Sequence, residues 1–191
     1  MIGPFRRPDP EEVVREHGAA VHRQLRRIFG PDTDVDDVFQ AAFVEILRSL
    51  HGFKGRSKLS TWIRRITWNV AYQEMRLRYH HQRLVSLDEA STPGPSHTEP
   101  DELVFKRQAM RNLYAGLESL GPKKRMPLVM HDIEGMTLRE ISQILGRPVQ
   151  TVASQLQAGR KQLAEWMQRQ RRIAVKKERG AQLRRGKVRR P

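Results

Sequence analysis

Basic and aromatic side chains are interleaved along residues 59–79, and this combination is suited to binding nucleic acid. At about 100° per residue, one side of a helix over this segment is apolar. The opposite side carries larger polar and aromatic residues, which are Thr61, Arg64, Arg65, Trp68, Tyr72, Met75, Arg76 and Tyr79. Aromatic rings stack on unpaired bases, and guanidinium groups bind phosphates. The alternative is that Trp68 and Tyr72 pack beneath a neighbouring helix and that the arginines are ordinary solvated charges.

The preceding segment, residues 51–58, reads as a loop with two glycines, three basic residues and Phe53. Glycine lets a backbone approach a ligand closely, and the Phe53 ring could stack against a base extruded from a duplex. Loops of this composition are common, so the loop alone does not identify a DNA site.

Residues 137–156 follow the pattern of a helix-turn-helix. Thr137 and Glu140 have the spacing of a capping box, and Gly146 ends the first helix. Apolar residues at helical spacing face inward, namely Leu138, Ile141, Leu145, Val149, Val152 and Leu156. Such a motif places its second helix in a major groove, and the residues presented are Arg147, Gln150, Thr151, Ser154, Gln155 and Gln157, with Arg160 and Lys161 nearer to phosphates. A plain helical hairpin is the alternative.

The elements that position these faces are all predicted to be helices. Apolar residues recur at spacings of three and one from Val35 to Leu50, and a looser stripe covers residues 13–28. Further stripes cover residues 103–120 and 128–133, and no segment shows strand alternation. The sequence therefore predicts an all-α fold with two small helical domains joined by a flexible linker.

Composition shifts predict the domain boundaries. Residues 86–100 are rich in Pro and small polar residues, which is typical of a linker. Residues 169–191 hold eleven basic residues and one acidic residue, which favours a disordered tail. The expected organisation is an N-terminal helical domain (1–85), a linker (86–100), a helix-turn-helix domain (101–168) and a basic disordered tail (169–191).

The charge of the whole chain indicates a polyanionic partner. Its 191 residues include 36 Lys and Arg against 21 Asp and Glu, a net charge of +15, and basic clusters gain free energy by releasing counterions from phosphate backbones. Cysteine is absent, which excludes disulfides, thiolate metal sites and thiol nucleophiles. No run approaches the roughly 18 apolar residues of a membrane span. We expect a cytoplasmic protein that does not insert into a membrane.

Taken in order, these segments resemble the extracytoplasmic-function group of bacterial RNA polymerase sigma factors. Residues 34–47 resemble the segment that binds the clamp helices of core polymerase. Residues 53–71 resemble the promoter-melting segment, including its Thr-Trp pair and its Ile-x-x-Asn step. Residues 132–146 with 150–152 resemble the helix-turn-helix that reads the upstream promoter element. The resemblance covers the chain from Glu11 to Met167.

The resemblance implies a factor that binds core RNA polymerase and directs promoter recognition, DNA melting and transcription initiation. Its partners would be duplex promoter DNA, the melted non-template strand and an anti-sigma factor, which could hold it at the membrane. A base would be flipped into the loop at residues 53–58. The family uses no cofactor or metal and makes or breaks no bond.

The resemblance also assigns residues to these roles. Core polymerase binding falls to Asp34, Asp36, Asp37, Gln40 and Glu45. Promoter melting and downstream-element binding fall to Phe53, Lys54, Arg56, Ser57, Lys58, Arg64, Arg65, Trp68, Asn69, Tyr72 and Arg76. Upstream-element binding falls to Arg147, Gln150, Thr151, Ser154, Gln155, Gln157, Arg160 and Lys161.

The chain departs from the family pattern in two places. Recognition helices of the family usually carry basic residues where this chain has Ala153, Gln155 and Ala158, and the segment after Arg169 runs beyond the end of many members. We expect the basic tail to replace the missing phosphate contacts with nonspecific attraction to DNA. The alternative is a solvated extension without a role.

Two other classes of protein compete with this interpretation. A stand-alone helix-turn-helix regulator would bind duplex DNA without polymerase, but it leaves the basic aromatic face unexplained. A nuclease would need a metal or nucleophile site. The cluster Asp32, Asp34, Asp36 and Asp37 suits helix capping better, and Gly52 and Gly55 lack the Lys-Ser/Thr of a phosphate loop. The sequence therefore does not favour an enzyme.

Overall fold

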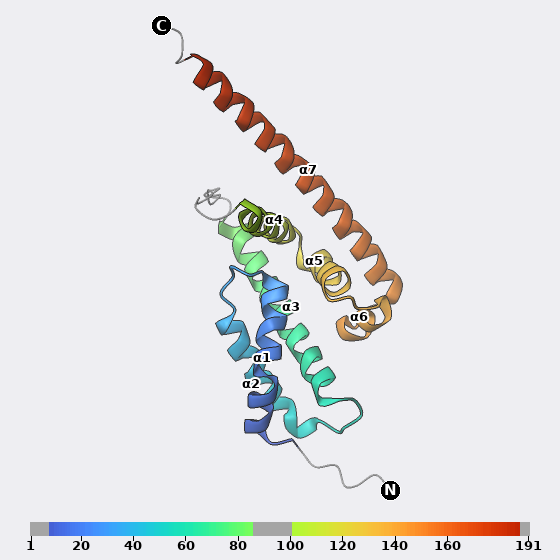
Figure 1. Cartoon of the computed structure of the whole chain (residues 1–191). Coiled ribbons are helices and arrows are strands. Elements are labelled where there is room, and N and C mark those ends of the chain that lie inside the picture. The colour runs from blue at the N-terminus through green and yellow to red at the C-terminus, as the bar shows by residue number, and fades with distance from the viewer. Residues whose placement is uncertain (1–7, 86–100, 188–191) are drawn as a thin grey trace.

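The computed structural model describes residues 8–85 and 101–187, and all regular structure in these ranges is helical (Figure 1). The first range forms α1 (Pro10–Phe29), α2 (Asp36–Ser49), the 3-10 turn η1 (Leu50–Gly52) and α3 (Leu59–Val85). The second forms α4 (Asp101–Glu118), α5 (Pro122–Leu128), the π-helix η2 (Val129–Ile133), α6 (Leu138–Leu145) and α7 (Val149–Lys187). The predicted all-α fold class is confirmed. The predicted linker, residues 86–100, lies outside the described residues.

Local capping sets both ends of α1. The Asp9 side chain accepts a hydrogen bond of 3.3 Å from the Glu11 amide, and Pro10 lies in the first turn, where no N–H is needed. At the other end the chain turns through Gly30 with φ at 116°, a conformation that other residues rarely adopt.

The N-terminal unit, which comprises α1, α2 and α3, is held together by apolar side chains from all three helices. Its buried residues include Val13, Val21, Leu25 and Ile28 on α1, Val38, Ala42 and Ile46 on α2, and Ile63, Trp68 and Ala71 on α3. Helix α3 contacts both α1 and α2. Its orientation, and that of its predicted DNA face, is therefore fixed by two neighbours.

The C-terminal unit, which comprises α4 to α7, has its own buried side chains. They include Leu117, Leu120, Met126, Met130, Ile141, Val152 and Leu156. Pro127 lies inside α5 and has no N–H to donate, and the helix widens into the π-helix η2 two residues later. Helices α4 and α7 approach closely at Gly116, where a Cβ would lie 2.6 Å from the Leu163 side chain.

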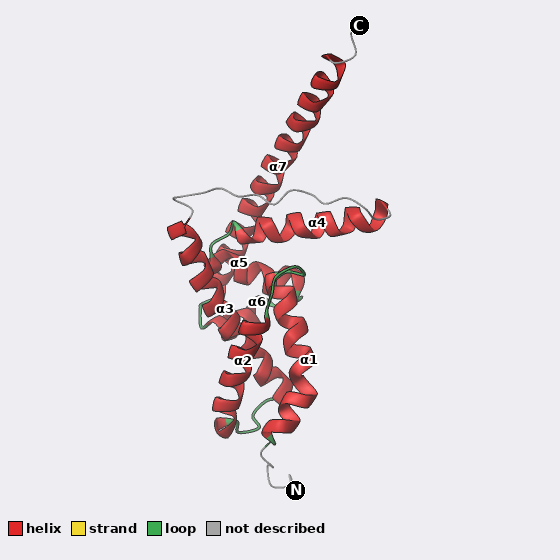
Figure 2. Ribbon diagram, turned by 90° about the vertical axis from the view of Figure 1, so that its left-hand side faces the viewer, coloured by secondary structure: helices red, strands yellow, loops and turns green. Residues whose placement is uncertain are grey.

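The predicted disordered tail is helical as far as Lys187, contrary to the sequence-based expectation. Helix α7 runs for 39 residues from the helix-turn-helix without interruption, and its later turns project away from the body of the molecule (Figures 1 and 2). Arg, Lys, Gln and Ala favour helix, and extending a helix that is already nucleated costs little. A highly charged segment of this kind cannot form a hydrophobic core of its own, but it can still form a helix.

The two units pack against each other. Their buried side chains form one continuous cluster, and α5 and α6 both contact α3. Figures 1 and 2 both show α5 and α6 beside α3, with α4 near the C-terminal end of α3. The predicted DNA faces of the two units are thus brought close to one another.

Candidate nucleic-acid interface

The outer face of α3 carries an exposed polar stripe. Arg65, Asn69, Gln73 and Arg76 lie at spacings of four, four and three residues, and all four side chains are exposed. This spacing places them on one side of the helix, where cations and an amide can follow a phosphate backbone. The sequence predicts three of these residues and misses Gln73, although the helical period between Asn69 and Arg76 could have revealed it.

The loop before α3 adds further positive charge. Lys54, Arg56, Ser57 and Lys58 are exposed, as predicted. Gly55 has φ at 68°, so the turn needs glycine there. The loop therefore offers basic side chains directly ahead of the stripe on α3.

Trp68 does not lie on the exposed face, so that prediction is wrong. Its side chain is 0% exposed and belongs to the core together with Ala71 and Met75, the latter also expected outside. The prediction assumed that one side of α3 is buried, whereas α1 and α2 pack on it from one unit and α5 and α6 from the other. In this structure Trp68 is therefore part of the core, and its side chain is not exposed for a contact with DNA.

Phe53 is also buried, contrary to the prediction that it stacks a flipped base. Its ring packs on Trp62 with a centroid distance of 5.2 Å and an angle of 49° between the rings. The contact ties the loop to the first turn of α3. Phe53 thus shapes the loop, and the exposed basic side chains beside it remain the candidates for DNA contact.

The helix-turn-helix has the predicted caps. The Thr137 hydroxyl accepts a hydrogen bond from the Glu140 amide at 3.3 Å, and the Glu140 carboxylate accepts bonds from the Thr137 amide at 2.8 Å and hydroxyl at 2.7 Å. These bonds, led by the hydroxyl, lower the pKa of Glu140. Gly146 closes α6 in the left-handed conformation. The predicted capping box and turn glycine are confirmed.

The second helix of the motif is seated by fewer apolar side chains than predicted. Val152 and Leu156 are buried against Ile141, but Val149 is 41% exposed. The turn is held instead by the Ser142 hydroxyl, which donates a hydrogen bond of 2.6 Å to the Arg147 carbonyl oxygen. Val149 is the first residue of α7 and contributes little to this contact between the two helices.

The outer face of α7 carries a second exposed stripe. Gln150, Ser154, Gln157 and Lys161 are all exposed, and their spacing of four, three and four residues places them on one side of the helix. Thr151 is half-buried beside them. Amides and a hydroxyl near a helix start can read base edges in a major groove, and Lys161 can meet a phosphate.

Arg160 is held by the protein, which the sequence-based assignment to phosphate did not anticipate. Its Nε donates a hydrogen bond of 2.9 Å to the Asp132 carboxylate on η2. This hydrogen bond lowers the pKa of Asp132 and raises the pKa of Arg160. Arg160 therefore links α7 to η2. Its exposed neighbour Lys161 is the better candidate for a contact with a DNA phosphate.

Helix α2 presents a different kind of surface. Asp34, Asp36, Asp37 and Gln40 are exposed and Glu45 is half-buried beside Ser49. Val44, which lies between Gln40 and Glu45 along the helix, is 56% exposed, and Leu47, which follows Glu45, is 38% exposed. Apolar side chains rimmed by charge are typical of a protein-binding surface. The sequence misses Val44 and places Leu47 in the core stripe.

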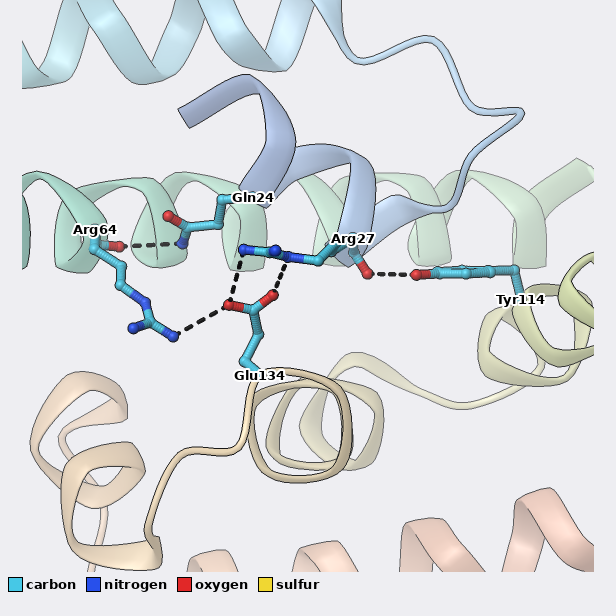
Figure 3. A network of polar contacts seen from close by, with 5 residues as sticks. All are labelled: Gln24, Arg27, Arg64, Tyr114 and Glu134. Atoms are coloured by element: carbon cyan, nitrogen blue, oxygen red, sulfur yellow. Dashed lines mark hydrogen bonds and ion pairs between the residues drawn. The ribbon is translucent and has the colours of Figure 1, made fainter. Parts of the chain in front are cut away.

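Several polar contacts join the two units (Figure 3). The Glu134 side chain, which follows η2, is 4% exposed and lies between Arg27 of α1 and Arg64 of α3. Arg27 Nε is 2.6 Å from its Oε1, and Arg64 Nη2 is 3.1 Å from its Oε2. Nearby, Tyr72 accepts a hydrogen bond from Arg147. Arg64 and Tyr72 are thus half-buried beneath the C-terminal unit.

Residues 8–85 and 101–187 contain neither a candidate membrane-spanning helix nor a candidate metal site. No helix there is both long enough and apolar enough to cross a membrane. The same residues contain no group of three or more His, Asp or Glu side chains arranged to hold a metal ion.

Two family models match the chain. Residues 13–81 match Sigma-70 region 2, and residues 110–163 match Sigma-70, region 4. Together these ranges cover more than half of the chain. The first contains α2 and the exposed stripe on α3, and the second contains the helix-turn-helix.

The chain is also similar in sequence to named sigma factors of two bacteria. The ECF RNA polymerase sigma factor SigE of Mycolicibacterium smegmatis is 31% identical over 161 residues, which are 84% of this chain and 62% of the relative. The ECF RNA polymerase sigma-E factor of Escherichia coli is 28% identical over 133 residues, 66% of this chain and 70% of the relative. The chain thus spans less than two thirds of the mycobacterial relative.

Two solved structures share the fold. One is CnrH in complex with the cytosolic domain of CnrY, with a TM-score of 0.53 and 23% identity, covering 83% of this chain and 87% of that one. The other is the sigma factor RpoE in complex with the anti-sigma factor NepR from Bartonella quintana, with a TM-score of 0.54 and 18% identity, covering 83% and 96%. At these identities the likeness concerns the fold alone.

Proposed function

Because the chain belongs to the sigma-70 family, in its extracytoplasmic-function group, we propose that it binds core RNA polymerase and directs promoter recognition, DNA melting and transcription initiation. The observation that carries this function is the presence of two separate exposed stripes, one on α3 in the region 2 match and one on α7 in the region 4 match. The chain makes and breaks no bond in this role, and it acts in the cytoplasm with the polymerase.

Core polymerase would bind the exposed face of α2. Asp37, Gln40 and Val44 lie on one side of that helix at spacings of three and four residues, and all are exposed. The apolar side chains of Val44 and Leu47 would be buried by the partner, and the carboxylates would pair with basic groups around them. Asp34 contributes indirectly, because its carboxylate accepts a hydrogen bond of 3.0 Å from the Asp36 amide and so shapes the helix start.

The upstream promoter element would be read as a duplex by α7. Gln150 and Ser154 lie in the first turns of the helix, where a recognition helix meets base edges, while Gln157 and Lys161 follow along the groove. Gln155 and Arg147 are hydrogen-bonded to each other at 3.0 Å. They could reach DNA as a pair once the N-terminal unit moves away.

The downstream element would be held as a melted strand by α3 and the loop before it. Arg65 and Arg76 would bind phosphates on either side of Asn69, and Lys54, Arg56 and Lys58 would extend the contact. Tyr72 supplies the one aromatic ring of the predicted set that is not buried in the N-terminal core. Trp68 and Phe53 act by holding α3 and the loop in place.

The later turns of α7 would attract DNA without reading its sequence. Arg169, Arg171 and Arg172 are exposed, and residues 169–191 carry eleven basic residues against one acidic residue. A partner of the anti-sigma class is also proposed. Both solved structures that share this fold are complexes. In one, RpoE is bound to the anti-sigma factor NepR, and in the other, CnrH is bound to the cytosolic domain of CnrY.

The test is transcription by core polymerase from a pool of genomic fragments, with and without the purified chain. The chain should give initiation at specific promoters and should bind the same fragments weakly by itself. Val44→Asp should abolish initiation because it places a charge in the apolar part of the α2 face. Strong binding of specific duplexes by the chain alone, with no binding to core polymerase, would establish the stand-alone regulator instead.

A further inference from the structure

A small cavity lies between the end of α1, the second half of α3 and the segment that joins α4 to α5. Its volume is about 70 Å³. One water fills about 10–15 Å³ of such space, so the cavity has room for several waters or for one small ion. Three charged side chains line it, those of Arg78, Glu118 and Arg125. With two positive charges against one negative charge, the cavity is suited to an anion.

Arg125 of α5 is a buried cation without a paired carboxylate. It is 8% exposed, and its Nη2 donates a hydrogen bond of 3.2 Å to the Ile28 carbonyl oxygen. Its buried Nε has no hydrogen-bond partner in the part of the chain that the structure describes. Burial lowers the pKa of Arg125, an effect that Glu118 partly offsets and Arg78 reinforces. A buried charge is costly unless it is paired, so an anion beside Arg125 would be stabilising.

Arg78 brings a second guanidinium to the same cavity from α3. Its Nε donates a hydrogen bond of 2.7 Å to the Glu74 carboxylate, and its Cζ lies 4.9 Å from the centre of the Phe29 ring. These contacts hold the guanidinium and leave its terminal nitrogens without a hydrogen-bond partner among residues 8–85 and 101–187. Because a guanidinium carries five N–H donors, both arginines have donors left for an anion in the cavity.

The cavity does not belong to the exposed stripe of α3. Arg76 is part of that stripe, and Arg78 follows two residues later, which turns it by about 200° around the helix. A strand held along the stripe therefore meets Arg76 and leaves Arg78 on the opposite side of α3. The cavity is thus separate from the surface assigned to the melted strand, and its ligand does not depend on the proposed function.

The arrangement of the two arginines favours a phosphate group over a carboxylate. A carboxylate offers two oxygens in one plane, which match the fork of a single arginine. A phosphate group offers oxygens in several directions and carries a charge of about −1.5 to −2 near neutral pH. It can therefore accept hydrogen bonds from Arg78 and Arg125 together. Glu118, an exposed residue of α4, is the one carboxylate that lines the cavity, and its charge opposes the binding of an anion.

We propose that this cavity binds a phosphate group, which bridges Arg78 of α3 and Arg125 of α5. The group is carried by the free ion or by a small phosphomonoester, because the cavity itself holds little more than the group. The bound anion supplies the negative charge that the buried guanidinium of Arg125 lacks. A ligand that binds only the folded chain stabilises it, so phosphate at ten times its dissociation constant raises the ratio of folded to unfolded chain about tenfold.

Binding can be measured on the full chain by equilibrium dialysis with radiolabelled inorganic phosphate, at constant ionic strength set with chloride. One ion should bind per chain, and Arg78→Gln should weaken binding by about tenfold or more, the loss of one charged hydrogen-bond donor. Arg15→Gln is the matched control. Arg15 also pairs with a glutamate of its own helix, Glu12, but it precedes Phe29 by 14 residues, or about 21 Å along α1.

Glu118→Gln gives the opposite expectation. It removes the carboxylate that opposes the anion, so it should tighten phosphate binding several-fold. Glu165→Gln is its control, because it makes the same chemical change at an exposed position of α7. A gain of affinity cannot result from misfolding, so Glu118→Gln keeps the test decisive if Arg78→Gln folds poorly, as judged by its helical circular dichroism.

Competition identifies the source of the phosphate group. Adenosine 5′-monophosphate that displaces the label more strongly than unlabelled phosphate does assigns the site to a phosphomonoester, and the reverse assigns it to the free ion; either result supports the site. Equal displacement by acetate overturns the choice of phosphate. Equal binding by the unmodified chain, Arg78→Gln and Glu118→Gln overturns the site itself. Failure to bind core polymerase would overturn the proposed function and leave the dialysis result unchanged.

Discussion

The Tyr114 hydroxyl donates a hydrogen bond of 2.7 Å to the main-chain carbonyl oxygen of Arg27, so a side chain of the C-terminal unit completes the last turn of α1. The Tyr114 ring lies on Gly30, only 3.0 Å from the point where a Cβ would stand. Both the missing side chain of Gly30 and its positive φ are needed for this contact. The turn after α1 is therefore shaped for the junction between the units.

Tyr114→Phe is expected to lower the free energy of unfolding by about 1–2 kcal/mol, because the Arg27 carbonyl loses its partner while the ring stays in place. Urea unfolding followed by circular dichroism measures the change. Tyr114→Ala should cost more, since it also removes the ring from Gly30. Equal unfolding midpoints for the unmodified chain and Tyr114→Phe would show that the bond contributes nothing.

The stabilising effect of the Tyr114 hydroxyl should depend on pH. Burial raises the pKa of Tyr114 above its ordinary value of about 10. The folded chain thus holds the phenolic proton more tightly than the unfolded chain, and this contribution is complete below about pH 10 and is lost as the pH rises through the folded-state pKa. The stability gap between the unmodified chain and Tyr114→Phe should shrink in urea titrations above about pH 10. A constant gap would contradict the assignment.

Trp68→Ala is expected to destabilise the whole N-terminal unit by about 3–5 kcal/mol, because it empties a large volume in the core. Arg65→Gln and Arg76→Gln should leave the unfolding free energy within about 0.5 kcal/mol and weaken single-strand binding by the chain. Thermal unfolding and fluorescence anisotropy separate the two effects. A stable Trp68→Ala protein with a selective melting defect would restore the sequence-based assignment.

The features that the sequence predicts correctly are those decided by neighbours along the chain. The capping box of Thr137 and Glu140 and the turn at Gly146 depend on a few consecutive residues, so their pattern suffices. The exposed stripe on α3 can also be predicted from helical spacing once the apolar side of that helix has been identified. Family resemblance adds the order of the regions, which no single motif carries.

The predictions that failed depend on contacts between distant segments. Trp68 is buried in the core of the N-terminal unit, and the spacing within α3 does not show how much of the helix its neighbours cover. The contact of Arg160 with Asp132, 28 residues away, is likewise absent from the sequence pattern, while the assignment of Arg160 to a phosphate stays a prediction. Leu47 belongs to the apolar stripe predicted for α2 but is 38% exposed, because no described helix covers that side of α2. Sequence patterns predict which side of a helix is apolar, but they do not predict which helices pack against each other.

Arg160→Gln and Lys161→Gln remove the same charge from adjacent positions of α7 and should act differently. Lys161→Gln should reduce the slope of log affinity against log salt for duplex DNA by about 0.9, the loss of one phosphate contact. Arg160→Gln should leave that slope unchanged and lower stability near neutral pH by freeing Asp132. Filter binding across a salt series and urea unfolding measure these effects. Equal changes in slope would show that Arg160 also reaches a phosphate.

The stability cost of Arg160→Gln should itself depend on pH. The hydrogen bond from Arg160 lowers the pKa of Asp132. A carboxylate whose pKa is depressed by folding contributes stability above its unfolded pKa of about 3.9 and loses it as the pH falls through the folded value. The gap between the unmodified chain and Arg160→Gln should therefore be largest near neutral pH and narrow below about pH 4.

Deleting residues 171–191 should flatten the salt dependence of duplex binding. The deleted segment carries ten of the eleven basic residues that follow Gln168, and each phosphate that they neutralise adds about 0.9 to the slope. Replacing the same ten residues by Gln keeps the length of the helix and removes its charge, so it separates attraction from shape. Both variants should lose affinity for specific and nonspecific duplexes alike, because residues that bind phosphates carry no sequence preference. An unchanged slope in the deletion would mean that the extension of α7 does not meet DNA, and a loss in the deletion alone would assign it a structural role.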